Sequence, residues 1–86
     1  MGKYEKLLDK ILRGTSDNNI DFADFCILLT RLNFQQRIKG NHHIFFREDL
    51  PEILNLQPND SKAKAYQVKQ VRNLIIKYKL GDNDVN

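Results

Sequence analysis

A glycine followed by an asparagine, Gly40-Asn41, constrains the fold of this chain more than any other feature. Both residue types tolerate positive φ angles, and the pair lies between two runs suited to extended structure, so it predicts a tight β-hairpin turn. The first predicted strand covers Phe34 to Lys39. The second begins at the two histidines, and its stronger part covers His43 to Arg47. Because successive strand residues face opposite sides of a sheet, His42 and His43 cannot serve one site together.

Apolar residues at helical spacing predict helices before the hairpin. The first predicted helix covers residues 3–13 and ends at Gly14, a residue type common where a helix turns into the left-handed region. Asp21 is a suitable N-cap for a second helix, which ends near Asn33.

After the hairpin, the pattern predicts one more strand and one more helix. The strand covers Glu52 to Gln57, with Pro51 just outside it, and residues 58–61 are expected to form a loop. The last helix covers about Ala65 to Leu80, with Gly81 as its stop signal, and residues 81–86 are expected to fray. Its expected core stripe comprises Tyr66, Val68, Val71, Leu74, Ile75 and Tyr78.

This element order predicts an α+β fold in a single domain over residues 1–86. An added N-terminal helix precedes an α-β-β-β-α core over residues 20–80, with helices packed on one face of a three-stranded antiparallel sheet. The layout resembles the double-stranded-RNA-binding-domain-like fold. Fold analogy alone assigns no function.

Positive charge is concentrated in two segments, although the formal net charge is only +3. Residues 31–47 and residues 62–79 each contain several basic residues and no acidic residue. These segments are expected to form a positive surface that attracts a polyanion. Lys69 and Arg72 are expected to share one solvated face of the last helix.

Several other kinds of chemistry are disfavoured by the sequence. The single cysteine, Cys26, cannot form an internal disulfide, and its apolar neighbours predict a desolvated, unreactive thiol. Metal-ligand motifs and Gly-rich phosphate loops are absent, so neither a metal nor a small-molecule cofactor is expected. There is no apolar run long enough for a membrane span and no signal-peptide core, which favours a cytoplasmic protein with no membrane partner.

Acid–base chemistry by a histidine beside cations is what remains. RNA carries its own nucleophile, the 2′-hydroxyl, so its cleavage requires proton transfer and charge stabilisation and can proceed without a metal. Histidine titrates near neutral pH and suits this task. From composition alone, however, both histidines are better explained as ordinary strand residues, and the sequence supports only a small domain suited to nucleic-acid binding.

From about Lys3 to Leu80, the chain resembles the HicA family of toxin–antitoxin mRNA interferases, in its longer variant with an added N-terminal helix. The family's hallmark is Gly-Ser-His followed by an aromatic residue, and Gly40-Asn41-His42 followed by Phe45 is similar to it. The segments Leu56-Gln57-Pro58 and Tyr66 to Arg72 also look typical of the longer members.

The resemblance implies a metal-independent endoribonuclease that cleaves mRNA and is neutralised by a HicB-like antitoxin covering the active histidine. The catalytic histidine of the family falls on His42, whereas His43 has no matching role and Asn41 replaces the usual serine. The candidate phosphate contacts are Arg37, Lys39 and Arg47, with Lys69 and Arg72 as weaker candidates.

Two other hypotheses stay open from the sequence. In a non-catalytic RNA-binding module the basic surface is sufficient, and His42 is incidental. The third hypothesis is a protein-interaction domain.

Overall fold

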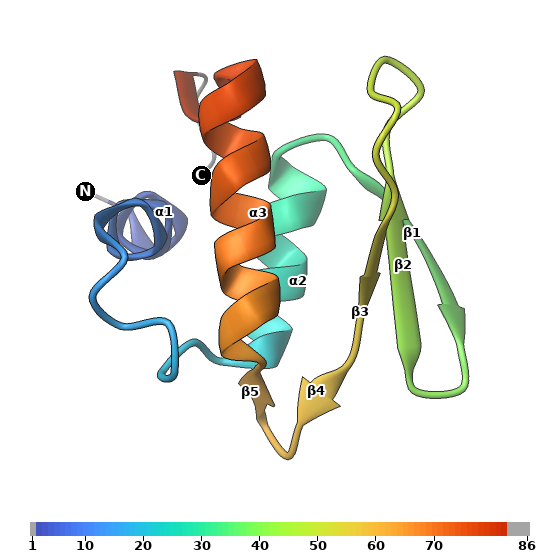
Figure 1. Ribbon diagram of the computed structural model, residues 1–86, viewed down its shortest axis with the longest axis horizontal. Helices are drawn as coiled ribbons and strands as arrows, with labels where there is room; N and C mark the ends of the chain where they lie inside the picture. Colours follow the sequence, from blue (N-terminus) through green and yellow to red (C-terminus); the bar gives the residue numbers. More distant parts are fainter. Residues whose placement is uncertain (1, 83–86) are drawn as a thin grey trace.

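Two helices pack against one side of a three-stranded antiparallel sheet, and a third helix lies on the far side of these two from the sheet (Figure 1). The structure is a computed structural model and describes residues 2–82. The helices are α1 (Lys3–Arg13), α2 (Phe22–Arg31) and α3 (Ala65–Tyr78), and the strands are β1 (Gln35–Lys39), β2 (His42–Phe46) and β3 (Leu54–Leu56), in the order β1-β2-β3. The predicted α+β class is therefore confirmed, with an N-terminal helix added to an α-β-β-β-α order.

The β1–β2 hairpin has the predicted two-residue turn. Lys39 pairs with His42, so Gly40 and Asn41 alone connect the strands. Gly40 has a φ of 59°, whereas Asn41 does not have a positive φ. A positive φ at only the first turn residue is typical of a type II′ turn, whose twist matches that of the flanking strands. The turn thus fixes the register that sets which face each strand residue occupies.

Most of the predicted helix ends are confirmed. The Asp21 side chain accepts a hydrogen bond from the backbone N–H of Asp24 at 3.0 Å, and Gly14 and Asn33 both have a φ of 72°. The end of α3 differs, because Lys79, not Gly81, takes the left-handed conformation that stops the helix. A short 3-10 helix, η1 (Leu80–Asp82), follows.

Gly81 has a packing role in place of the predicted stop. A Cβ atom on this residue would lie 3.0 Å from a methyl carbon of Leu8, so a glycine here allows η1 to approach α1 closely. Of the predicted frayed tail, residues 81 and 82 belong to η1, and residues 83–86 lie outside the described part of the chain.

The predicted loop over residues 58–61 is instead part of a second, two-stranded hairpin. Its strands are β4 (Pro58–Asn59) and β5 (Lys62–Ala63), and Asp60 in its turn has a φ of 56°. The Ala63 N–H donates to the carbonyl of Ile20 at 2.8 Å. This bond connects the hairpin to the start of α2, so loop residues that looked irregular in sequence become part of the packed structure.

One hydrophobic core lies between the helix layer and the sheet. Its fully buried members include Phe25, Phe45 and Leu54. The α3 stripe is confirmed at Val68, Val71, Leu74 and Ile75, and Tyr78 is partly buried against it. Tyr66 was wrongly assigned to the core, because its side chain is 65% exposed. No helix of the described residues is long and apolar enough to cross a membrane.

Candidate functional site on the open sheet face

Within residues 2–82, no helix covers the side of the sheet away from the helices (Figure 1). Strand alternation assigns residues to this open face, because Phe45, Leu54 and Leu56 are buried on the other side. The open-face residues are Gln35, Arg37 and Lys39 from β1, His42, Ile44 and Phe46 from β2, and Asn55 from β3. The hairpin register therefore places His42 on a solvent-accessible surface together with two basic residues.

The His42 imidazole is held by a side chain of the neighbouring strand. His42 Nδ1 lies 3.0 Å from Oδ1 of Asn55. An amide oxygen only accepts, so this contact is a hydrogen bond when Nδ1 carries a proton. In the neutral tautomer that is protonated at Nδ1, the lone pair lies on Nε2, which has no hydrogen-bond partner among residues 2–82. This tautomer is the one that a proton-accepting histidine requires.

His43 occupies the opposite face, as the alternation predicts. Its ring makes an edge-to-face contact with Phe22 of α2, with ring centroids 4.9 Å apart, and its Nδ1 lies 3.2 Å from Oε1 of Gln36. His43 is partly buried between the sheet and the helix layer, whereas His42 is exposed. The two imidazoles thus have similar amide partners in different settings, and His42 is the more exposed of the two.

Arg37 and Lys39 share the open face with His42. Lys39 is paired directly with His42, and Arg37 is paired with Ile44, one position further along the same face. Both side chains are exposed, and neither forms an ion pair within residues 2–82. These two cations can therefore neutralise a phosphate brought to His42.

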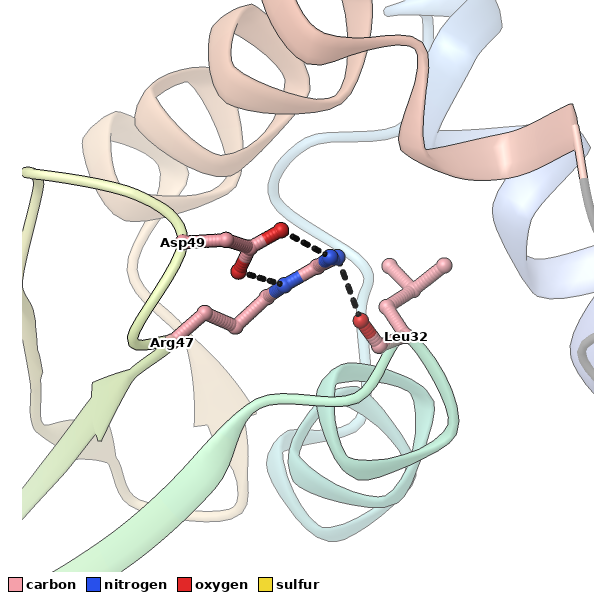
Figure 2. A network of polar contacts seen from close by, with 3 residues as sticks. All are labelled: Leu32, Arg47 and Asp49. Atoms are coloured by element: carbon pink, nitrogen blue, oxygen red, sulfur yellow. Dashed lines mark hydrogen bonds and ion pairs between the residues drawn. The ribbon is translucent and has the colours of Figure 1, made fainter.

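Arg47 has a different position from the other predicted phosphate contacts. Its guanidinium forms two hydrogen bonds to the Asp49 carboxylate, at 2.9 and 2.6 Å, and one to the Leu32 carbonyl at 2.9 Å (Figure 2). The side chain is only 18% exposed. The hydrogen bonds from Arg47 also hold the pKa of the Asp49 carboxyl below its ordinary value. Arg47 therefore joins the end of α2 to the segment after β2, and each of its three side-chain nitrogens donates one hydrogen bond within the protein.

Arg72 is turned toward the protein, which corrects the prediction that it shares a solvated face with Lys69. Its Nη1 donates to the Ile11 carbonyl at 3.2 Å and to the Asp17 carboxylate at 2.8 Å. A Cβ atom on Gly14 would lie 3.3 Å from the same nitrogen. Arg72 thus fastens the end of α1 to α3. Lys69 is exposed, but it belongs to the helix layer and is not brought to the open face.

Sequence reasoning missed Asn55 and the residue that supports it. Gln67 of α3 is buried, and its side chain contacts the backbone on either side of the end of β3. Its amide nitrogen lies 3.4 Å from the Asn55 carbonyl, and its amide oxygen accepts from the Gln57 N–H at 3.3 Å. Asparagine between two buried leucines was a usable signal, but only the β2–β3 register identifies His42 as its partner.

Other reactive groups give no second site within residues 2–82. The Cys26 thiol is partly buried, and burial raises its pKa to about 11, which disfavours the nucleophilic thiolate. No group of three or more side chains suited to metal binding converges in this part of the chain.

Comparisons with known proteins returned no matching family model, no matching curated protein and no matching solved structure. The resemblance to the HicA family therefore depends on this chain's own motifs, Gly40-Asn41-His42 followed by Phe45, Leu56-Gln57-Pro58, and Tyr66 to Arg72.

Proposed function

We propose that this chain is a HicA-like toxin, an endoribonuclease that cleaves mRNA with His42 as its general acid and base. The observation that carries the proposal is the exposed imidazole of His42, whose Nδ1 contacts Asn55 and whose Nε2 has no partner among residues 2–82, on the same face as two exposed cations. The HicA-like segment around Gly40 to His42 supports the same assignment.

The reaction we propose uses the nucleophile that RNA contains. His42 Nε2 takes the proton from a 2′-hydroxyl, and the 2′-oxygen attacks the adjacent phosphorus. The bond from phosphorus to the 5′-oxygen then breaks, and the leaving oxygen receives the proton back from the imidazolium. The products are a 2′,3′-cyclic phosphate and a 5′-hydroxyl. Arg37 and Lys39 stabilise the negative charge that develops on the phosphate oxygens.

Asn55 is a positioning residue in this scheme. An amide that accepts from Nδ1 keeps the proton off Nε2 and fixes the plane of the ring, as the third member of a catalytic triad does. Gln67 extends this support from α3 to the backbone of Asn55. We therefore assign the proton transfer to His42 and its orientation to Asn55.

The proposed partner is a HicB-like antitoxin that covers the open face in the cytoplasm, where mRNA is translated. An inhibitor that excludes RNA needs an interface of about 1,200 Å² or more, and acidic groups on it would raise its rate of association with Arg37 and Lys39. The expected interface includes His42. An antitoxin footprint confined to α1, with His42 still accessible to RNA, would count against this mode of neutralisation.

Expression of the chain without its antitoxin, combined with cleavage assays on purified protein, tests the function. The parent should arrest growth and cleave RNA, and His42→Ala should lose both, by about 10² to 10⁴ in rate. His43→Gln is the matched control, since it changes the adjacent histidine on the other face. Circular dichroism must show that both variants fold.

Asn55→Ala separates positioning from folding. It should lower the turnover rate and shift its pH profile while leaving RNA affinity nearly unchanged, and Asn55→Gln should fail to restore the rate because its longer amide misplaces the acceptor. Cleavage by His42→Ala at the parent rate would refute the assignment, and the non-catalytic RNA-binding alternative would then explain the basic surface.

A further inference from the structure

Apolar side chains line a shallow depression on the open face, further along the sheet from His42. The depression has a volume of about 330 Å³ and is lined by residues that include Arg37, Ile44, Phe46, Leu50, Pro51 and Ile53. Ile53 is 64% exposed although it is a large aliphatic residue. The helix layer cannot cover this surface, because it packs on the other side of the sheet.

The depression is at a defined position relative to His42. His42, Ile44 and Phe46 are alternate residues of β2, so they follow one another on one face at intervals of about 7 Å. The Arg37 guanidinium carbon lies 6.0 Å from the centroid of the Phe46 ring. A cation, an aromatic ring and aliphatic walls are therefore arranged on the same face as the imidazole, further along β2.

We propose that this depression binds one unpaired nucleobase of the RNA whose phosphate is brought to His42. An aromatic ring and a guanidinium are the groups on which proteins stack unpaired bases, and Ile44 and Ile53 add apolar contacts. The base of a duplex cannot enter, because its faces are already stacked and its edges paired. The site therefore selects single-stranded RNA. This inference rests on the proposed function, which brings RNA to the same face.

A nucleobase matches the size of the depression. The depression alone is too small for a stable protein interface, which buries about 800 Å² on each partner, so an antitoxin that covers the open face would use it only as part of a larger surface. The rim of the depression also includes Arg37, and Lys39 follows Arg37 on the same face, so a ligand with an apolar ring attached to a phosphate matches both parts.

The test measures RNA affinity in a His42→Ala background, so that cleavage cannot interfere. Fluorescence anisotropy would compare a short single-stranded RNA, the same RNA with one abasic nucleotide placed at each position in turn, and a blunt duplex. Phe46→Leu removes the aromatic face, and Ile53→Ser removes an exposed contact without disturbing the core. Ile76→Ser is the matched control, because Ile76 is also 60% exposed but belongs to α3.

We expect one abasic position to weaken binding about tenfold, equivalent to about 1.4 kcal/mol. Phe46→Leu should weaken binding of the intact RNA to a similar extent and leave the affinity of that abasic RNA unchanged. Ile53→Ser should weaken binding, and Ile76→Ser should not. Equal affinity for intact and abasic RNA at every position, or equal effects of Ile53→Ser and Ile76→Ser, would overturn the base site.

The outcomes distinguish this inference from the proposed function. Base discrimination by a protein that, with His42 restored, does not cleave RNA would retain the base site and remove the ribonuclease proposal. Cleavage without base discrimination would retain the ribonuclease proposal and remove the base site. Absence of RNA binding would overturn both. A dimer, seen by sedimentation, that Ile53→Ser dissociates without changing RNA affinity would identify the depression as a protein interface and overturn the base site.

Discussion

Replacing Arg72 by alanine should lower the stability of the protein itself, and this loss should not depend on RNA. Arg72 is only 15% exposed, and its partner Asp17 is 21% exposed, so water replaces their hydrogen bonds poorly. One ionic hydrogen bond to Asp17 contributes about 1.5–3 kcal/mol, and the bond to the Ile11 carbonyl adds about 1 kcal/mol. We therefore expect a loss of about 3 kcal/mol in the free energy of unfolding.

For a domain of this size, such a loss lowers the melting temperature by about 12–24 °C. The measurement is urea unfolding followed by circular dichroism, in which the midpoint should fall while the slope with denaturant stays constant. Lys69→Ala is the matched control, because Lys69 is an exposed cation of the same helix, and it should change stability by less than about 0.5 kcal/mol.

A double-mutant cycle with Asp17→Ala identifies the source of the loss. If Arg72 acts through Asp17, the double variant should be much more stable than the sum of the two single losses predicts. Stability of Arg72→Ala indistinguishable from that of Lys69→Ala, together with weaker RNA binding by Arg72→Ala, would refute this reasoning and return Arg72 to the phosphate contacts.

The remaining predictions concern RNA binding, cleavage, acid stability and thiol reactivity. Neutralising Arg37 and Lys39 together should reduce the slope of log affinity against log salt concentration by about 1.4 for single-stranded RNA, whereas the matched double change of Lys69 and Lys79 should leave the slope unchanged. Cleavage should persist in excess EDTA, since the 2′-hydroxyl and His42 supply the nucleophile and the proton transfer; activity lost in chelator and restored by a divalent ion would contradict this. The Glu52 carboxyl has a pKa below its ordinary value of 4.5, chiefly because the Tyr78 hydroxyl donates to it, so its contribution to stability is present above pH 4.5 and is lost as the pH falls through the lowered value. Urea midpoints measured from pH 7 to pH 3 should accordingly fall less for Glu52→Gln than for the parent, and parallel curves would argue against the contact. With a pKa of about 11, Cys26 should react with iodoacetamide at pH 7.5 much more slowly in the native protein than in urea, and equal rates would show that its burial is not protective.

Local sequence signals predicted the elements of this fold well. The turn at Gly40-Asn41 and the caps at Asp21, Gly14 and Asn33 depend on a few adjacent residues, and all four appear where they were expected. Similarly, the opposite orientations of His42 and His43 follow from strand alternation alone.

Interactions between distant segments were beyond this reasoning. Arg72 and Arg47 looked like free cations because their partners are set by tertiary packing, and Asp17 is 55 residues away from Arg72 in sequence. The role of Asn55 likewise needs the β2–β3 register, which a loop between the strands does not reveal. The error at Tyr66 arose because an aromatic residue near the apolar stripe was assigned to it, whereas Gln67 and Val68 form the buried side of the first turn of α3.

The alternation along β2 also separates residues that hold the fold together from residues that form its surface. His43 and Phe45 contact the helices or the core, while the alternate residues His42, Ile44 and Phe46 belong to the open face. Substitutions at the second set change this surface and disturb little of the packing beneath it. The binding properties of the open face can therefore be altered by point mutation at nearly constant stability.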